Sequence, residues 1–210
     1  MCINKEVSIS AFIICSVTCF YLYKRNRLND RWIAIMFGYL GTMQFLEYLM
    51  WIDQECSGLN QMATNLGFIH NILQPIISIG IAYYFTKGKI PTYIYGICIL
   101  YIVTSLPFII QSKKNNQCSL PCNGTIDGLS WEYTETEYKT YVWFIFLLAL
   151  SAPFLTMKKN RFIYTGCIIL SYIGAHIISI NRCPTKITSP NGSWWCLMAI
   201  FVPLLSIVIN

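Results

Sequence analysis

The sequence predicts an all-α integral membrane protein, a polytopic bundle of seven transmembrane helices. Hydrophobic residues make up 55% of the 210 residues and charged residues only 11%, whereas soluble domains carry about 25% charged residues. The mean hydropathy is +0.51. So few charges cannot cover the surface of a soluble domain, which disfavours a soluble enzyme. We therefore treat residues 1–210 as a single transmembrane domain.

Seven apolar runs account for the predicted helices. Most are close to the ~20 residues that cross about 30 Å of hydrocarbon, and the fifth and seventh are shorter. In chain order the runs are 7–23, 32–52, 64–86, 91–110, 141–156, 162–180 and 194–209. Four prolines lie inside them, at Pro75, Pro107, Pro153 and Pro203. Because proline removes one helical hydrogen bond, we expect a kink at each.

Basic residues concentrate in the short first, third and fifth connections. These hold nine of the fifteen Lys and Arg residues, namely Lys24, Arg25, Arg27, Arg31, Lys87, Lys89, Lys158, Lys159 and Arg161. The positive-inside rule places such loops in the cytosol, so the N-terminus is expected outside and the C-terminus cytosolic. Because the charges are spread over loops, the net charge of +6 does not indicate nucleic-acid binding. Membrane lipid is the expected partner, and the oligomeric state is left open.

The even-numbered connections carry features of an oxidising exterior. The N-x-S/T sequons predict glycosylation at Asn123 and Asn191. Four cysteines also lie there, Cys56, Cys118, Cys122 and Cys183. We expect at least one disulfide among them, which would tie the long 111–140 loop to a neighbouring loop. The protein is accordingly expected in the secretory pathway, the plasma membrane or a viral membrane.

Polar side chains inside the runs define the candidate ligand-binding site. Titratable groups in hydrocarbon are costly and mark functional positions. The candidates are Gln44, Glu47, Trp51, His70, Gln74 and His176. Counted from the outer ends of their runs, Glu47, His70 and His176 all lie roughly 6 to 9 Å deep. We expect Glu47 to be within hydrogen-bond or one-water reach of His70, with Gln44 or Gln74 as a second contact.

Three functions remain open at this point. The first is binding or passage of a small ligand or ion through a polar cavity in the outer half. The second is a structural or assembly role, in which Glu47 and the histidines only fix helix packing. The third, an intramembrane enzyme, has less support, because no G-x-S-x-G motif or closely spaced histidines occur. We predict no catalytic residue, metal or cofactor, and we interpret the C-x-x-x-C spacing of Cys118 and Cys122 as a structural staple.

One segment carries a family resemblance. The stretch Gln44-Phe-Leu-Glu-Tyr-Leu-Met-Trp51, followed by Cys56, Asn60 and Leu73-Gln-Pro75, is similar to uncharacterised multi-span membrane proteins of large DNA viruses and some protists. The resemblance implies a multi-span membrane protein, with a viral protein among the expected sources. It implies no activity.

Overall fold

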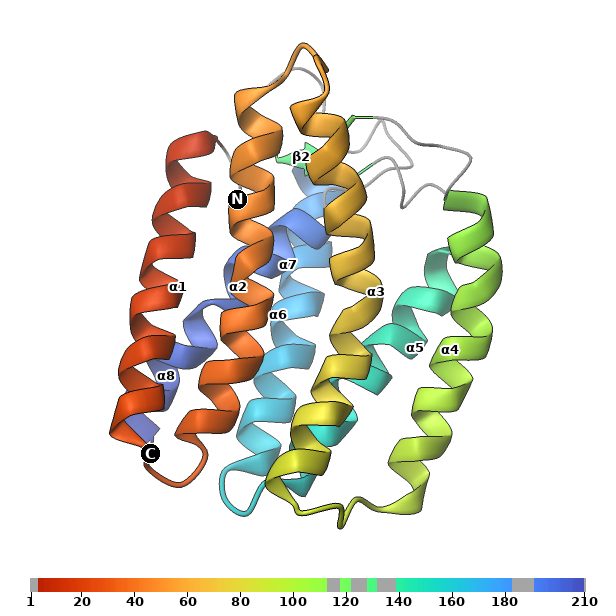
Figure 1. Cartoon of the computed structure of the whole chain (residues 1–210). Helices are drawn as coiled ribbons and strands as arrows, with labels where there is room; N and C mark the ends of the chain where they lie inside the picture. The colour runs from red at the N-terminus through yellow and green to blue at the C-terminus, as the bar shows by residue number, and fades with distance from the viewer. Residues whose placement is uncertain (1–3, 113–117, 122–127, 132–138, 183–190, 210) are drawn as a thin grey trace.

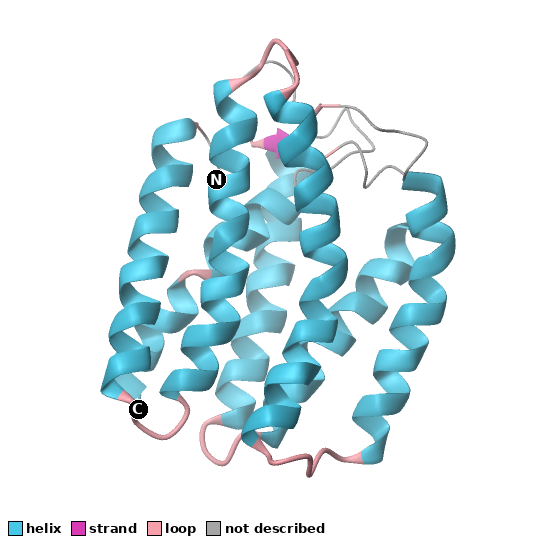
Figure 2. Cartoon of the chain, in the orientation of Figure 1, coloured by secondary structure: helices cyan, strands magenta, loops and turns pink. Residues whose placement is uncertain are grey.

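The computed structural model describes residues 4–112, 118–121, 128–131, 139–182 and 191–209. Within these residues the regular secondary structure is helical apart from β1 (Leu120–Pro121) and β2 (Leu129–Ser130), which pair antiparallel. The helices pack side by side in one bundle, with the strands at one end (Figures 1 and 2). The predicted all-α fold is confirmed.

Five described helices are long and apolar enough to cross a membrane. They are α1 (Lys5–Arg25), α2 (Asp30–Ile52), α3 (Leu59–Phe85), α4 (Thr92–Ser112) and α6 (Arg161–Arg182). Each of the other two predicted runs forms two shorter helices. They are α5 (Lys139–Ser151) with the 3₁₀ helix η4 (Ala152–Thr156), and α7 (Asn191–Ala199) with α8 (Phe201–Ile209). Each predicted run therefore corresponds to helical structure, and two of the seven are interrupted.

Prolines explain both interruptions. A proline cannot donate a backbone hydrogen bond, and its ring clashes with the carbonyl group four residues earlier. Pro153 lies at the start of η4, so α5 ends at Ser151 and the chain continues as a 3₁₀ turn. Pro203 follows Ala199, the last residue of α7, by four residues, and the helix breaks between them. In contrast, α3 and α4 continue through their prolines.

Apolar side chains lie on the outside of the bundle and several polar side chains lie inside, which is the reverse of a soluble protein. On the outside, Val17 of α1 is 63% exposed and Leu170 of α6 is 68% exposed. Inside, Gln44, Glu47 and Gln74 are completely buried. An apolar exterior is favourable in hydrocarbon, where polar side chains must find partners inside the bundle.

The start of α3 is the main correction to the predicted boundaries. The helix begins at Leu59, five residues before the predicted run at position 64. The Asp53 carboxylate accepts hydrogen bonds from the backbone N–H groups of Ser57, Gly58 and Asn60. These bonds satisfy donors that the first turn of a helix leaves open. The N–H of Asn60, followed by that of Ser57, contributes most to lowering the pKa of Asp53 to about 2.

The segment around Ser119 is fastened to the connection between α2 and α3. A disulfide joins Cys56 to Cys118, with the two Cα atoms 6.0 Å apart. The Asn60 amide donates to the carbonyl groups of Met50 and Ser119, each at 2.9 Å, and its oxygen accepts from the Ser119 N–H. The pair Cys56 and Cys118, at disulfide distance, corresponds to the expected link between the long loop and a neighbouring connection, and it differs from the interpretation of Cys118 as part of a C-x-x-x-C staple.

Some sequence predictions fall outside the described residues. These are Cys122, Cys183 and the sequon at Asn123. Asn191 is the first residue of α7, but its side chain is not described.

At the opposite end of the bundle the basic connections lie together (Figure 1). Arg25 forms two hydrogen bonds with the Asp30 carboxylate, Nε to Oδ2 at 2.7 Å and Nη2 to Oδ1 at 2.8 Å. The same guanidinium donates to the carbonyl groups of Ser206 and Ile207, each at 2.9 Å. Arg25 therefore joins the ends of α1 and α2 to the end of α8.

Candidate functional site

The polar residues selected from the sequence form two separate hydrogen-bonded groups. In the first group, the Gln44 amide donates to Oε2 of Glu47 at 3.0 Å, within α2. In the second, His70 and Gln74 are bonded within α3, with Gln74 Nε2 lying 3.1 Å from His70 Nδ1. The expected contact of Glu47 with Gln44 is present. A direct hydrogen bond between Glu47 and His70 is excluded, because both ring nitrogens of His70 face other partners.

The two groups also lie at different depths. Glu47 is five residues from Ile52, the end of α2, or about 7.5 Å at 1.5 Å per residue. His70 is eleven residues from Leu59, the start of α3, or about 16 Å. The prediction of one common depth is wrong for His70, because it rested on a helix start at position 64.

The remaining candidates are distributed as follows. Trp51 is half-buried and packs against the core of the bundle. His176 has an exposed side chain on α6, whereas Glu47 is completely buried. Among the described residues, no group of three or more His, Cys, Asp or Glu side chains could hold a metal ion.

His70 is fixed between α2 and its own helix. Its Nε2 lies 2.9 Å from the Tyr39 carbonyl oxygen and 2.9 Å from Thr42 Oγ1. The Tyr39 ring stacks on the imidazole with centroids 4.2 Å apart, and the Tyr39 hydroxyl donates to the His70 carbonyl oxygen. A carbonyl oxygen can only accept a hydrogen bond. In neutral His70 the hydrogen is therefore on Nε2, and Nδ1 accepts from the Gln74 amide.

The hydrogen bonds continue along α3 from His70 through Gln74 to Asn71. The same Gln74 Nε2 that contacts His70 also donates to Asn71 Oδ1 at 2.8 Å. Gln74 is completely buried, and its amide nitrogen directs its two hydrogens at His70 and Asn71, both on α3. These hydrogen bonds connect Tyr39 and Thr42 on α2 through His70 and Gln74 to Asn71.

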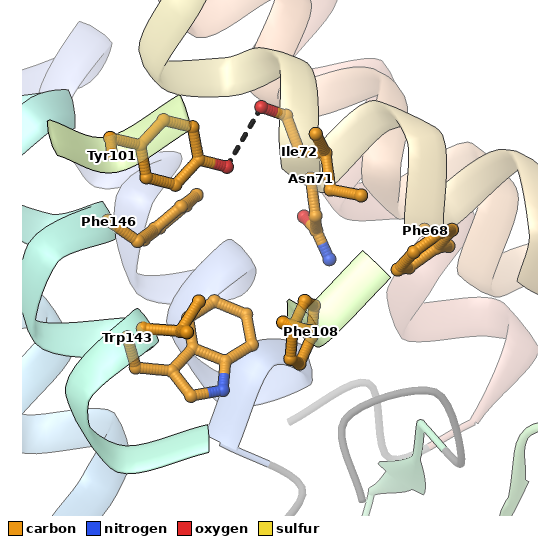
Figure 3. Close-up of a pocket in the computed structure, with 8 residues that line it drawn as sticks. Phe68, Asn71, Ile72, Tyr101, Phe108, Trp143 and Phe146 are labelled. Carbon is orange, nitrogen blue, oxygen red and sulfur yellow. Dashed lines mark hydrogen bonds between the residues drawn. The ribbon is translucent and has the colours of Figure 1, made fainter. Parts of the chain in front are cut away.

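Asn71 lines a pocket between α3, α4 and α5 (Figure 3). The pocket is a small hollow of about 20 Å³, partly open to the exterior of the bundle. Its lining residues are aromatic or aliphatic apart from one amide: Phe68, Asn71, Ile72, Tyr101, Phe108, Val142, Trp143 and Phe146. Figure 3 shows the Asn71 amide nitrogen directed into the space between the rings. The one phenolic hydroxyl in the lining belongs to Tyr101, and it donates a hydrogen bond to the Ile72 carbonyl oxygen at 2.9 Å.

The pocket walls are held by contacts between aromatic rings. Phe68 of α3 and Phe108 of α4 have ring centroids 6.2 Å apart, and Trp143 and Phe146 of α5 have centroids 5.1 Å apart. Phe108 also meets Trp143 edge to face at 6.5 Å. Aromatic pairs at such distances are favourable beyond the area they bury. Three helices therefore contribute to one rigid aromatic wall.

Sequence reasoning missed this pocket. Its aromatic residues are dispersed over three apolar runs, where they are indistinguishable from side chains that face lipid. One signal was available, since Asn71 lies between the two selected residues His70 and Gln74.

The fold and the pocket define a class of helical protein with several apolar helices long enough to cross a membrane. Within that class, the chain belongs to the family of unknown function DUF5765, whose model matches residues 6–120. The matched part includes α1 to α4, the hydrogen-bonded residues His70, Gln74 and Asn71, and both cysteines of the disulfide. No curated protein and no solved structure matches this chain.

Proposed function

We propose that this protein is a seven-span membrane protein that binds a small, mostly apolar molecule in the pocket between α3, α4 and α5. The observation that carries the proposal is the aromatic pocket with a single amide, Asn71, held by buried Gln74. Sites for small molecules have this composition, with apolar walls and a few polar groups.

The proposed topology includes the two interrupted helices as membrane crossings. The basic connections would then be cytosolic and the disulfide-bonded connection outside. Phe108 is four residues from Ser112, the end of α4 that lies away from the basic connections. The pocket would therefore be in the outer half of the bundle. A membrane setting supplies apolar ligands directly from the lipid phase.

Binding of an apolar molecule is favoured over passage of an ion. A cation that leaves water needs several oxygen ligands, whereas the walls of this pocket are rings and aliphatic chains. The second candidate function is a structural or assembly role. It is supported by Gln44 and Glu47, which are completely buried and bonded to each other, as expected for groups that fix helix packing.

Binding of tritiated 2-ethylnaphthalene tests the proposal. The protein is placed in lipid nanodiscs, and saturable binding is measured by scintillation proximity. Val142→Trp would fill the pocket with a larger side chain and should abolish saturable binding. Ile99→Trp adds the same side chain on the exposed face of α4, where Ile99 is 62% exposed, and should leave binding unchanged.

The structural alternative gives a different result. If the native protein shows only the non-saturable uptake of empty nanodiscs, the pocket is not a binding site and the structural role is favoured. Thermal unfolding of each variant shows that it is folded. If Val142→Trp does not fold, Ile72→Trp fills the same pocket from α3 and is measured in its place.

A further inference from the structure

We propose that α1 carries a binding site for one anionic phospholipid at the end that adjoins the basic connections. In this site the lipid phosphate contacts Lys24 and Arg31, and an acyl chain lies along the exposed face of α1. The proposal rests on the proposed function only in that the helices span a membrane. It is independent of the pocket, because α1 contributes none of the lining residues.

One face of α1 is apolar along most of its length and ends in a cation. Ile13, Val17 and Phe20 are 53%, 63% and 65% exposed. Together with Lys24 they recur every three or four residues, which places them on one side of the helix. The other side of α1 packs against α2, and α1 lies at the edge of the bundle (Figure 1). The exposed face is therefore in contact with lipid in a membrane.

This face has the length of one lipid acyl chain. Ile13 and Lys24 are eleven residues apart on α1, or about 16 Å at 1.5 Å per residue. One leaflet contributes about half of the 30 Å hydrocarbon core. A phospholipid whose headgroup lies at Lys24 can therefore cover the face down to Ile13 with its acyl chain.

Two cations are held over exposed aromatic rings at the end of this face. Lys24 Nζ lies 5.5 Å from the centre of the Phe20 ring. The guanidinium of Arg31, from the first turn of α2, lies 5.1 Å from the centre of the Tyr23 ring. Both distances are within the range of about 6 Å in which a cation is attracted to a ring. Tyr23 is three residues from Phe20, so both rings and both cations lie on the same side of α1.

Neither cation has an acidic partner among the described residues. At this end of the bundle the described acid is Asp30, and Arg25 holds its carboxylate at 2.7 Å. The other described acids lie toward the opposite ends of α1 and α2, and they are Glu6, Glu47, Asp53 and Glu55. Lys24 and Arg31 thus place two positive charges at the border of the hydrocarbon, where an anionic headgroup is the complementary partner.

A phospholipid matches this face with both of its parts. Its phosphate oxygens accept charge-assisted hydrogen bonds from an ammonium and a guanidinium group, and its acyl chain covers the apolar side chains. A zwitterionic headgroup brings a cation of its own next to the two basic groups, so a headgroup with net negative charge is favoured. Each basic residue at a membrane surface strengthens the binding of anionic lipid about 5-fold, and two strengthen it about 25-fold.

Native mass spectrometry of the full chain in a non-ionic detergent tests the proposal. The probes are dioleoylphosphatidylglycerol and dioleoylphosphatidylcholine, which have the same acyl chains and differ in headgroup charge. The native protein should bind the anionic lipid more tightly. The double substitution Lys24→Gln with Arg31→Gln should weaken binding of dioleoylphosphatidylglycerol about 25-fold and leave binding of dioleoylphosphatidylcholine unchanged.

The matched control is Lys158→Gln with Lys159→Gln. It removes the same charge from two exposed lysines in another basic connection, away from α1, and should leave binding of the anionic lipid unchanged. Lys24→Arg with Arg31→Lys keeps both charges and should bind as the native protein does. Thermal unfolding shows that each variant is folded. If the double substitution does not fold, the two single substitutions are measured, and each should weaken binding about 5-fold.

Three results would overturn the proposal. The first is equal binding of the two lipids to the native protein. The second is an equal loss of anionic-lipid binding in the double substitution and its control, which assigns the attraction to the whole basic end. The third is displacement of the lipid by soluble glycerol phosphate, which assigns the site to a free phosphate. All three leave the naphthalene assay of the pocket unaffected, so the two proposals fail independently.

Discussion

Arg25, the last residue of α1, holds Asp30, the first residue of α2, in a two-point ion pair, and its guanidinium also reaches the end of α8. The side chains are 9% and 0% exposed. Through its hydrogen bond to the Ser206 carbonyl oxygen, Arg25 also joins the first helix to the last, across a sequence separation of 181 residues.

Loss of Asp30 should therefore destabilise the bundle strongly. Asp30→Ala leaves the buried Arg25 guanidinium without its carboxylate, which typically costs about 3–5 kcal/mol. The free energy of unfolding can be measured by denaturation in mixed micelles. Arg27→Ala is the control, because only the backbone N–H of Arg27 contacts Asp30. Equal stability of the two variants would contradict the importance of the ion pair.

The disulfide should contribute separately at the other end of the bundle. Cys118→Ser removes the link to Cys56 and should lower the free energy of unfolding by about 2–5 kcal/mol. Peptide mapping without reductant should recover the two cysteines in one linked fragment. Cys98→Ser changes a half-buried free thiol and serves as control. Recovery of Cys56 and Cys118 as free thiols from protein expressed through a secretory pathway would refute the bond.

Asp53 should make stability depend on acidic pH. Its pKa in the folded protein is about 2, below the usual 3.8. A lowered pKa contributes stability that is complete above about pH 4 and is lost as the pH falls through 2. The melting temperature of the native protein should thus fall more steeply between pH 4 and 2 than that of Asp53→Asn. The control is Glu55→Gln, a change at an exposed neighbouring acid. Identical pH profiles for native protein and Asp53→Asn would argue against the cap.

Two substitutions of Glu47 test whether its hydrogen bond to Gln44 stabilises the protein. Glu47→Leu removes the acceptor of the Gln44 amide in a buried position and should cost about 1–3 kcal/mol. Glu47→Gln keeps an oxygen of the same reach and should cost less. The comparison requires only thermal or chemical unfolding curves. If Leu is tolerated as well as Gln, the hydrogen bond does not stabilise the helix packing.

The proposed orientation predicts labelling from one side only. A cysteine introduced at Lys89 should react with an impermeant thiol reagent only from the cytosolic side of sealed vesicles. In a eukaryotic secretory system, glycosidase treatment should reduce the mass through Asn123, Asn191 or both. Labelling of position 89 from outside would reverse the topology.

Helix positions followed from the sequence because hydropathy and proline are local properties. The run predicted at 32–52 is the helix Asp30–Ile52, and the run at 162–180 is Arg161–Arg182. Likewise, Pro153 and Pro203 marked positions where the backbone hydrogen-bond pattern changes. The sequence could also restrict the disulfide to a few cysteines, because connections on one side of a bundle share one environment.

Helix ends that depend on side-chain caps were harder to predict. The start of α3 is set by the Asp53 carboxylate, which binds N–H groups up to seven residues away. Hydropathy assigned the polar first turn of this helix to a loop. That error made His70 appear too shallow, and the expected contact with Glu47 depended on it.

Only the tertiary structure decided which side chains meet. Phe68, Phe108 and Trp143 come from three helices, and their convergence depends on how each helix is rotated about its axis. Hydropathy reports that a residue is apolar but does not distinguish a side chain that faces lipid from one that faces a neighbouring helix, because both surroundings are equally apolar. The sequence alone thus determined the helical segments and the polar candidates. Packing decided that Asn71, rather than Glu47, faces a pocket.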